Sequence, residues 1–189
     1  DPFLTGNPKA GMAVDSIRKA DLVLVTHGHP DHVGDSHAIA KRTGAVLLSV
    51  PELSPDDEIQ GMGMNFGGTV SVKGLPVSMV KAEHSSLFAW KNPATGKIES
   101  HYDGEPMGFI IELENGFKIW HMGDTGVFGD MKWIAEYYKP DLVLIPVGGN
   151  FTMDPADAAY ALRELIKPKF VIPIHYRMPG APQELIQAL

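Results

Sequence analysis

The chain has no cysteine among its 189 residues. This absence excludes disulfides, thiolate metal sites and cysteine nucleophiles, so any metal site must use histidine and carboxylate side chains. Long apolar runs are also lacking, since no segment approaches the ~20 residues that cross a bilayer. The sequence opens with no basic and apolar leader, and we therefore expect a cytoplasmic protein that has no membrane partner.

Basic residues are outnumbered, with 16 Lys and Arg against 23 Asp and Glu, which gives a net charge of −7. Nucleic acid is therefore a disfavoured partner, because non-specific binding to it depends on Lys and Arg neutralising phosphates. A small anionic substrate stays open, because bound divalent ions reverse the sign of the charge locally. The expected partners are a small-molecule substrate and a second copy of the chain in a homo-oligomer.

The apolar runs that are present are short, β-branched and regularly spaced, as in a single domain over residues 1–189 with one hydrophobic core. We predict strands at 21–26, 45–50, 69–72, 75–82, 107–113, 117–122, 142–147 and 170–175. Helices are predicted at 35–43, 128–138, 154–166 and 182–189. Residues 51–68, which are rich in Pro, Gly, Asp and Met, are predicted to form a loop with a short helix.

Local signals set several of these boundaries. Asn115-Gly116 marks a hairpin turn, Gly44 ends a helix, and Asp154 followed by Pro155 begins one. Strands come first in hairpins and later alternate with helices. This order predicts an α/β fold of the α+β type, with two mixed sheets packed face to face and helices outside.

The main chemical signal is a cluster of ligand-type residues directly after the first predicted strand, Thr26-His27-Gly28-His29-Pro30-Asp31-His32-Val33-Gly34. His27 and His29 lie two apart in an extended segment and should project to the same side. Asp31 and His32 follow where the chain turns toward a helix. A chance cluster is the alternative, but shuffling would produce one in roughly one chain per thousand. Imidazole with carboxylate suits Zn²⁺, Mn²⁺, Fe or Ni.

Three more ligand-type residues end later strands, namely His84, Asp124 and His175. Taken singly, each is a common cap or surface group. Their recurrence at strand ends, where layered folds gather functional loops, favours ligands.

The pattern His-x-His-x-Asp-His with His84, Gly123-Asp124 and His175 resembles the metallo-β-lactamase superfamily. It is most similar there to the uncharacterised metal-dependent hydrolases related to the ascorbate-6-phosphate lactonase branch. The segments that carry this likeness are 1–8, 84–86, 123–126 and 150–153. The resemblance implies a four-layer αββα sandwich, the metallo-β-lactamase fold, that lacks its first strand in this chain.

The resemblance also implies a ligand set for two divalent ions, with Zn²⁺ expected first and Mn, Ni or Fe as alternatives. One ion would be held by His27, His29 and His84, the other by Asp31, His32 and His175, with Asp124 bridging. The family's chemistry is attack by a metal-bridging hydroxide on an ester, lactone, amide or phosphodiester. Asp31, Asp124 and His175 are the predicted catalytic residues.

Other functions stay open on the same fold. A ribonuclease or phosphodiesterase acting on nucleic acid is disfavoured by the acidic charge. Di-iron oxidoreductases on this fold are expected to carry Glu at the position where this chain has His29. A non-catalytic scaffold is expected to have lost some of the metal ligands. All seven ligand positions are kept here.

Two departures from the family pattern concern the start of the chain and position 149. Family members begin with a strand that carries Gly-His before the Asp1–Leu4 segment, and Asp is expected where Gly149 stands. One hypothesis is a processed chain whose cleaved N-terminal segment stays bound as a partner; a deliberately shortened chain is the other.

Three other histidines and one arginine near these motifs are predicted to lie outside the metal site. His37 is predicted on a solvated helix face, His101 in a polar loop, and Arg177 on the surface. His121 is predicted to pack or to hydrogen-bond a loop.

Overall fold

The computed structural model describes residues 1–53 and 59–189, which form two compact units. The first unit holds residues 1–53, 59–65 and 85–105, and the second holds 66–84 and 106–189. The single domain over residues 1–189 stays a prediction.

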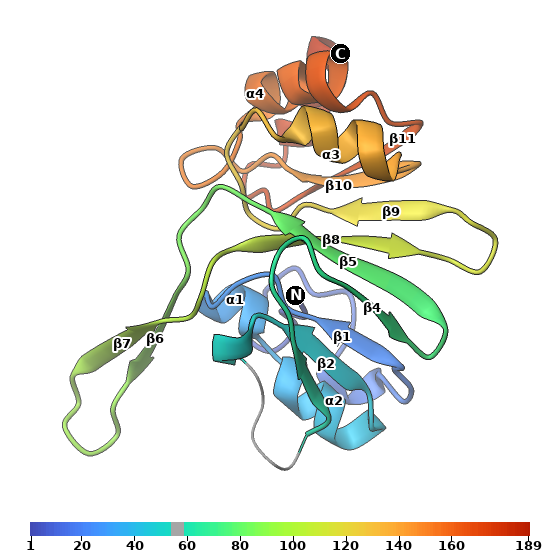
Figure 1. The fold of residues 1–189 in the computed structure, drawn as a ribbon. Coiled ribbons are helices and arrows are strands. Elements are labelled where there is room, and N and C mark those ends of the chain that lie inside the picture. The colour runs from blue at the N-terminus through green and yellow to red at the C-terminus, as the bar shows by residue number, and fades with distance from the viewer. Residues whose placement is uncertain (54–58) are drawn as a thin grey trace. The chain divides into compact units, whose positions relative to one another are not determined.

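The first unit is built on a three-stranded sheet in the order β1 (Leu22–Leu24), β2 (Val46–Ser49) and β3 (Gly61–Gly63) (Figure 1). Its described strands run parallel, with Val23 opposite Leu47. Every residue of β2 is buried, as expected for a central parallel strand. In the described residues of this unit, four short helical segments accompany the sheet: η1 (Val14–Ser16), α1 (Pro30–Val33), α2 (Ser36–Thr43) and η2 (Pro51–Leu53).

Helix α2 packs Ile39 and Ala40 into the same core as Val23 and Leu47. It ends at Gly44, whose φ of 71° lets the Gly44 N–H reach the carbonyl of Ala40. That end is the predicted one. An antiparallel hairpin of β6 (Leu87–Lys91) and β7 (Ile98–Tyr102) completes the first unit.

The second unit is a six-stranded mixed sheet in the order β11-β10-β9-β8-β5-β4. Strands β4 (Thr69–Val72), β5 (Leu75–Lys81), β8 (Met107–Glu112) and β9 (Lys118–His121) pair antiparallel. Strands β10 (Leu142–Pro146) and β11 (Phe170–Ile174) continue the sheet in parallel.

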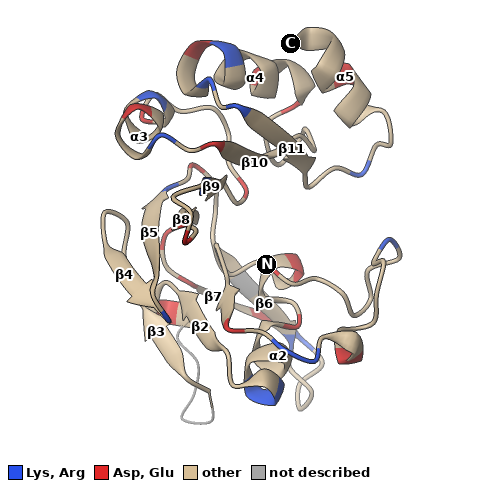
Figure 2. Cartoon of the chain, turned by 90° about the vertical axis from the view of Figure 1, so that its right-hand side faces the viewer, with Lys and Arg blue, Asp and Glu red and all other residues tan. Residues whose placement is uncertain are grey.

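Helices α3 (Met131–Tyr138), α4 (Pro155–Tyr160) and α5 (Ala181–Ala188) cover β10 and β11 (Figures 1 and 2). Helix α4 runs on as a π-helical segment, η3 (Ala161–Ile166). Their core includes Met131, Ile134, Val143, Ile145 and Leu185. None of the helices in the described part of the chain is long and apolar enough to cross a membrane.

Most predicted elements are confirmed, but strands β3, β6 and β7 and the short helices η1 and α1 were missed. The segment predicted as a loop at 51–68 contains β3, which pairs with β2, while its residues 54–58 lie outside the described ones. The prediction of His101 in a polar loop is wrong, because β7 pairs His101 with Phe88 of β6. In both places few residues are buried, so the apolar alternation that signals a strand is weak.

Candidate metal centre

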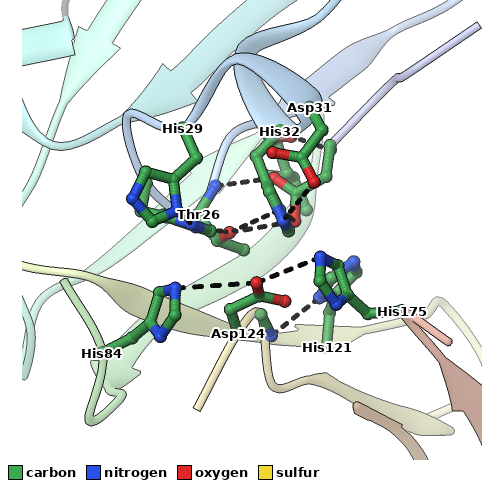
Figure 3. Close-up of polar contacts among 12 residues, drawn as sticks. Thr26, His29, Asp31, His32, His84, His121, Asp124 and His175 are labelled. Carbon is green, nitrogen blue, oxygen red and sulfur yellow. Dashed lines mark hydrogen bonds and ion pairs between the residues drawn. The ribbon is translucent and has the colours of Figure 1, made fainter. Parts of the chain in front are cut away.

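Four of the predicted ligands gather in the first unit, where the chain leaves β1 and enters α1. The Nε2 of His27 lies 2.8 Å from the Nδ1 of His29, so these two side chains do project to one side. The ring of His32 lies 4.1 Å from that of His27, between ring centroids. Asp31 places a carboxylate oxygen 3.9 Å from the Nε2 of His32 (Figure 3).

Asp1 and Thr26 orient two of these imidazoles. The Asp1 carboxylate lies 3.0 Å from the Nδ1 of His32 and accepts hydrogen bonds from the Thr26 N–H and hydroxyl, at 2.8 and 2.9 Å. The Thr26 hydroxyl also lies 3.0 Å from the Nδ1 of His27. A partner at Nδ1 fixes the ring and makes Nε2 the ligand nitrogen. Neither Asp1 nor Thr26 was predicted to orient a ligand.

The backbone between His27 and His29 is held by two residues that flank the β6–β7 hairpin. Gly28 donates its N–H to the Ser86 hydroxyl at 3.1 Å, and that hydroxyl donates to the carbonyl of Asp103 at 3.2 Å. A Cβ on Gly28 would lie 2.4 Å from a carboxylate oxygen of Asp103, which leaves no room for a side chain. Neither Ser86 nor Asp103 was predicted to support the site.

The other three predicted ligands gather in the second unit. Asp124 is 3% exposed, and one of its carboxylate oxygens lies 3.6 Å from the Nε2 of His84 and 3.2 Å from the Nε2 of His175 (Figure 3). A single carboxylate oxygen thus lies between two imidazoles that come from different strand ends.

Hydrogen bonds tie the loop of Asp124 to the end of β5. The Thr125 hydroxyl accepts the N–H of Glu83 at 3.0 Å, and the carbonyl of Glu83 accepts the N–H of Gly126 at 3.0 Å. His121 accepts the N–H of Gly123 on its Nδ1 at 3.0 Å, so the predicted hydrogen bond to a loop is confirmed. These bonds fix the carboxylate of Asp124 relative to His84.

His175 follows β11 with a left-handed backbone, at φ 50°. That conformation is uncommon and costs energy for a residue other than glycine. It places His175 against Gly148, where a Cβ would lie 2.3 Å from the His175 carbonyl and 3.3 Å from its Nδ1. Position 148 therefore requires glycine for His175 to keep this place.

Both clusters have the chemistry of metal ligands. They offer imidazole nitrogens together with buried or half-buried carboxylates and no thiolate, and in the first unit the Nδ1 atoms of His27 and His32 are engaged. The His and Asp groups that could hold a metal ion include all seven predicted ligands.

A family model described as the beta-lactamase superfamily domain matches residues 1–176. This chain belongs to that superfamily. Two relatives are named UPF0173 metal-dependent hydrolase. The one from Polynucleobacter asymbioticus is 56% identical over 188 residues, covering 93% of this chain and 66% of the relative. The one from Polaromonas sp. is 52% identical over 209 residues, covering 100% and 75%. The chain thus spans 66–75% of the length of these two relatives.

Solved structures of this superfamily share the fold. Igni18, a metallo hydrolase from Ignicoccus hospitalis, matches with a TM-score of 0.80 and 35% identity over 96% of this chain and 77% of its own. The metallo-beta-lactamase fold protein YhfI from Bacillus subtilis matches with a TM-score of 0.65 at 13% identity, over 89% and 69% of the two chains. The predicted fold class is confirmed, and the chain is a metal-dependent hydrolase of the beta-lactamase superfamily.

Proposed function

We propose that this superfamily member hydrolyses an ester, lactone, amide or phosphodiester bond at a centre of two divalent metal ions. The proposed ligands are His27, His29 and His84 for one ion and Asp31, His32 and His175 for the other, with Asp124 shared. One observation carries the proposal: a buried carboxylate oxygen of Asp124 lies between the Nε2 atoms of His84 and His175. A carboxylate flanked in this way suits a bridge between two cations.

The bound ions would supply Lewis acidity and activate a water molecule at neutral pH. The protein supplies orientation: Asp1 and Thr26 hold the Nδ1 atoms of His32 and His27. Asp31 keeps 41% of its side chain exposed, so its carboxylate can receive and release a proton beside His32. Zn²⁺ is the proposed metal, because five histidines with two carboxylates and no thiolate suit it well.

Turnover of chromogenic model substrates tests this function on the full-length protein. We expect p-nitrophenyl acetate or bis(p-nitrophenyl) phosphate to be hydrolysed, the activity to be lost on chelation, and Zn²⁺, Mn²⁺ or Ni²⁺ to restore it. Asp31→Asn should lower kcat by about a hundredfold, as for loss of a proton-transfer group. The exposed Asp130, changed to Asn, is the matched control. Full activity in protein shown to be metal-free would overturn the proposal.

A further inference from the structure

Residues 1–5 form a strap that runs along the predicted metal-binding motif in the first unit. One end of the strap contacts His32, because the Asp1 carboxylate lies 3.0 Å from the Nδ1 of that residue. In the middle of the strap, the carbonyl of Pro2 accepts the N–H of Asp35 at 2.8 Å. The other end is bound by the Asp35 side chain. The strap is therefore attached at both ends to residues that lie only three positions apart in the chain.

Asp35 uses its carboxylate for the strap and not for its own helix. It is the N-cap residue of α2, a position where an Asp side chain usually accepts an N–H from the first turn. Here the side chain makes no such bond. Its Oδ2 instead accepts the N–H groups of Leu4 and Thr5, at 2.9 and 2.8 Å, across 31 and 30 positions of the chain. The role of this carboxylate is thus long-range attachment of the strap rather than helix capping.

Gly34, directly before Asp35, leaves the space that the strap needs. Its φ of 41° lies in the left-handed region, which favours glycine. A Cβ at this position would lie 2.3 Å from the carbonyl oxygen of Pro2, so a side chain would push the strap away from the motif. Gly34 and the Asp35 carboxylate therefore act on the same segment, since one gives it room and the other binds it.

Helix α1, which lies next to these contacts, depends on tertiary support. It has only four residues, and it carries Asp31 and His32. A single helical turn is unstable alone, because forming it fixes several dihedral angles for one hydrogen bond. The strap contacts α1 at His32 and is bound just after the helix by Asp35. These contacts hold the part of the chain that carries two predicted ligands.

We infer that Asp35 is a positioning residue for the proposed metal centre. Its carboxylate holds the strap, the strap holds the Asp1 carboxylate in place, and Asp1 fixes the imidazole of His32 for the ion. The inference rests on the proposed function and extends it, because it names a residue outside the seven ligands that controls the metal affinity of the site.

The Zn²⁺ affinity of the full-length protein tests the inference in a double-mutant cycle, measured by competition with a chromogenic chelator. Asp35→Ala and Asp1→Asn should each lower the affinity by about tenfold, the low end for loss of a group that orients a ligand. Because both changes break the same series of contacts, the double variant should bind Zn²⁺ no more weakly than the weaker single variant. Losses that multiply to about a hundredfold would show that Asp35 does not act through Asp1, and would overturn the inference.

Two further variants guard this cycle. Asp35→Asn keeps an oxygen that can accept both N–H groups, so it should restore most of the affinity. Asp130→Ala is the matched control, because Asp130 is likewise an N-cap residue whose side chain makes no cap bond, and it should leave the affinity unchanged. If Asp35→Ala does not fold, Asp35→Asn replaces it, and its smaller loss must disappear in the Asp1→Asn background. Wild-type affinity in Asp35→Ala would overturn the inference.

The imidazole of His32 reports on the same contact without any metal. In protein treated with chelator, the ¹⁵N NMR shifts of this ring should change in the same direction in Asp35→Ala and Asp1→Asn, and should not change in Asp130→Ala. Unchanged His32 shifts in Asp35→Ala contradict the inference. A wild type that binds no Zn²⁺ contradicts the proposed function instead, and the His32 shifts then decide the inference alone.

Discussion

Gly28 separates two predicted ligands at a point where the Asp103 carboxylate lies against the backbone. We predict that Gly28→Ala destabilises the protein by about 1–3 kcal/mol, the usual cost of overpacking. The reason is that an added Cβ would lie 2.4 Å from Asp103 Oδ2. Urea unfolding of the metal-free protein measures the effect without any contribution from a bound ion.

Gly11→Ala is the matched control for this substitution. A Cβ at Gly11 meets no atom within 4 Å, so this change should be neutral or slightly stabilising. Equal free energies of unfolding for the two variants would show that Asp103 does not constrain the histidine motif.

Asp1 is a positioning residue for His32, which it meets at Nδ1 within 3.0 Å while both side chains are largely buried. Asp1→Asn keeps the shape but weakens the acceptor, so metal affinity should fall by about tenfold, the low end for loss of a group that orients a ligand. Competition with a chromogenic chelator measures this in the full-length protein. Unchanged affinity would mean that Asp1 only anchors Thr26, through its bonds to the Thr26 N–H and hydroxyl.

The ligands were predictable from the sequence, but the residues that orient them were not. His27, His29, Asp31 and His32 stand together, and ligand chemistry alone identifies them. Asp103, by contrast, is 75 positions from Gly28, and the fact that they touch becomes visible only in the fold. Side chains of this kind are ordinary polar residues until their partners are known.

At the scale of elements, helix α4 (Pro155–Tyr160) depends on the residue that caps its N-terminus. Asp154 accepts hydrogen bonds from the N–H groups of Ala156 and Asp157, both at 2.9 Å. Asp154→Ala should therefore destabilise the protein by about 1 kcal/mol. Asp130→Ala, at the start of α3, should cost little, because Asp130 makes no such bond. Chemical unfolding of both variants compares them, and equal losses would contradict the capping role.

The elements that were predicted have strong local signals, and those that were missed do not. Asp154-Pro155, Gly44 and Asn115-Gly116 marked boundaries that the structure confirms. Strand β3 reads Gly-Met-Gly and exists because it pairs with the buried β2, a long-range contact that no local pattern reveals. The π-helical continuation of α4 likewise had no signal in the sequence.

At the scale of the whole molecule, Asp141 contributes to the pH dependence of the stability of the fold. Its carboxylate bonds the Lys169 ammonium at 2.7 Å and the Lys118 N–H at 3.0 Å, and these bonds hold its pKa below the ordinary 3.8. A lowered carboxyl pKa stabilises the fold above the unfolded value and loses that contribution as pH falls through the folded value. The melting temperatures of wild type and Asp141→Asn should therefore differ at pH 7 and converge below pH 3.8. A gap that persists in acid would contradict this assignment.

The fold of the whole chain followed from a motif resemblance rather than from periodicity. Alternation and turn signals predict an α/β fold whose strands are joined by hairpins and crossovers, and several architectures share these features. Ligand chemistry and the superfamily are the basis for the proposal that seven ligands form one centre: His27, His29, Asp31, His32, His84, Asp124 and His175. It is therefore the claim that most needs a direct measurement.

That measurement is the metal content of the full-length protein, purified without chelator and reconstituted with Zn²⁺, determined by plasma mass spectrometry for wild type, Asp124→Ala and the control Asp130→Ala. We predict two ions per chain for wild type and the control, and no more than one for Asp124→Ala. Two ions retained without Asp124, or none bound by the wild type, would contradict a shared centre bridged by that carboxylate.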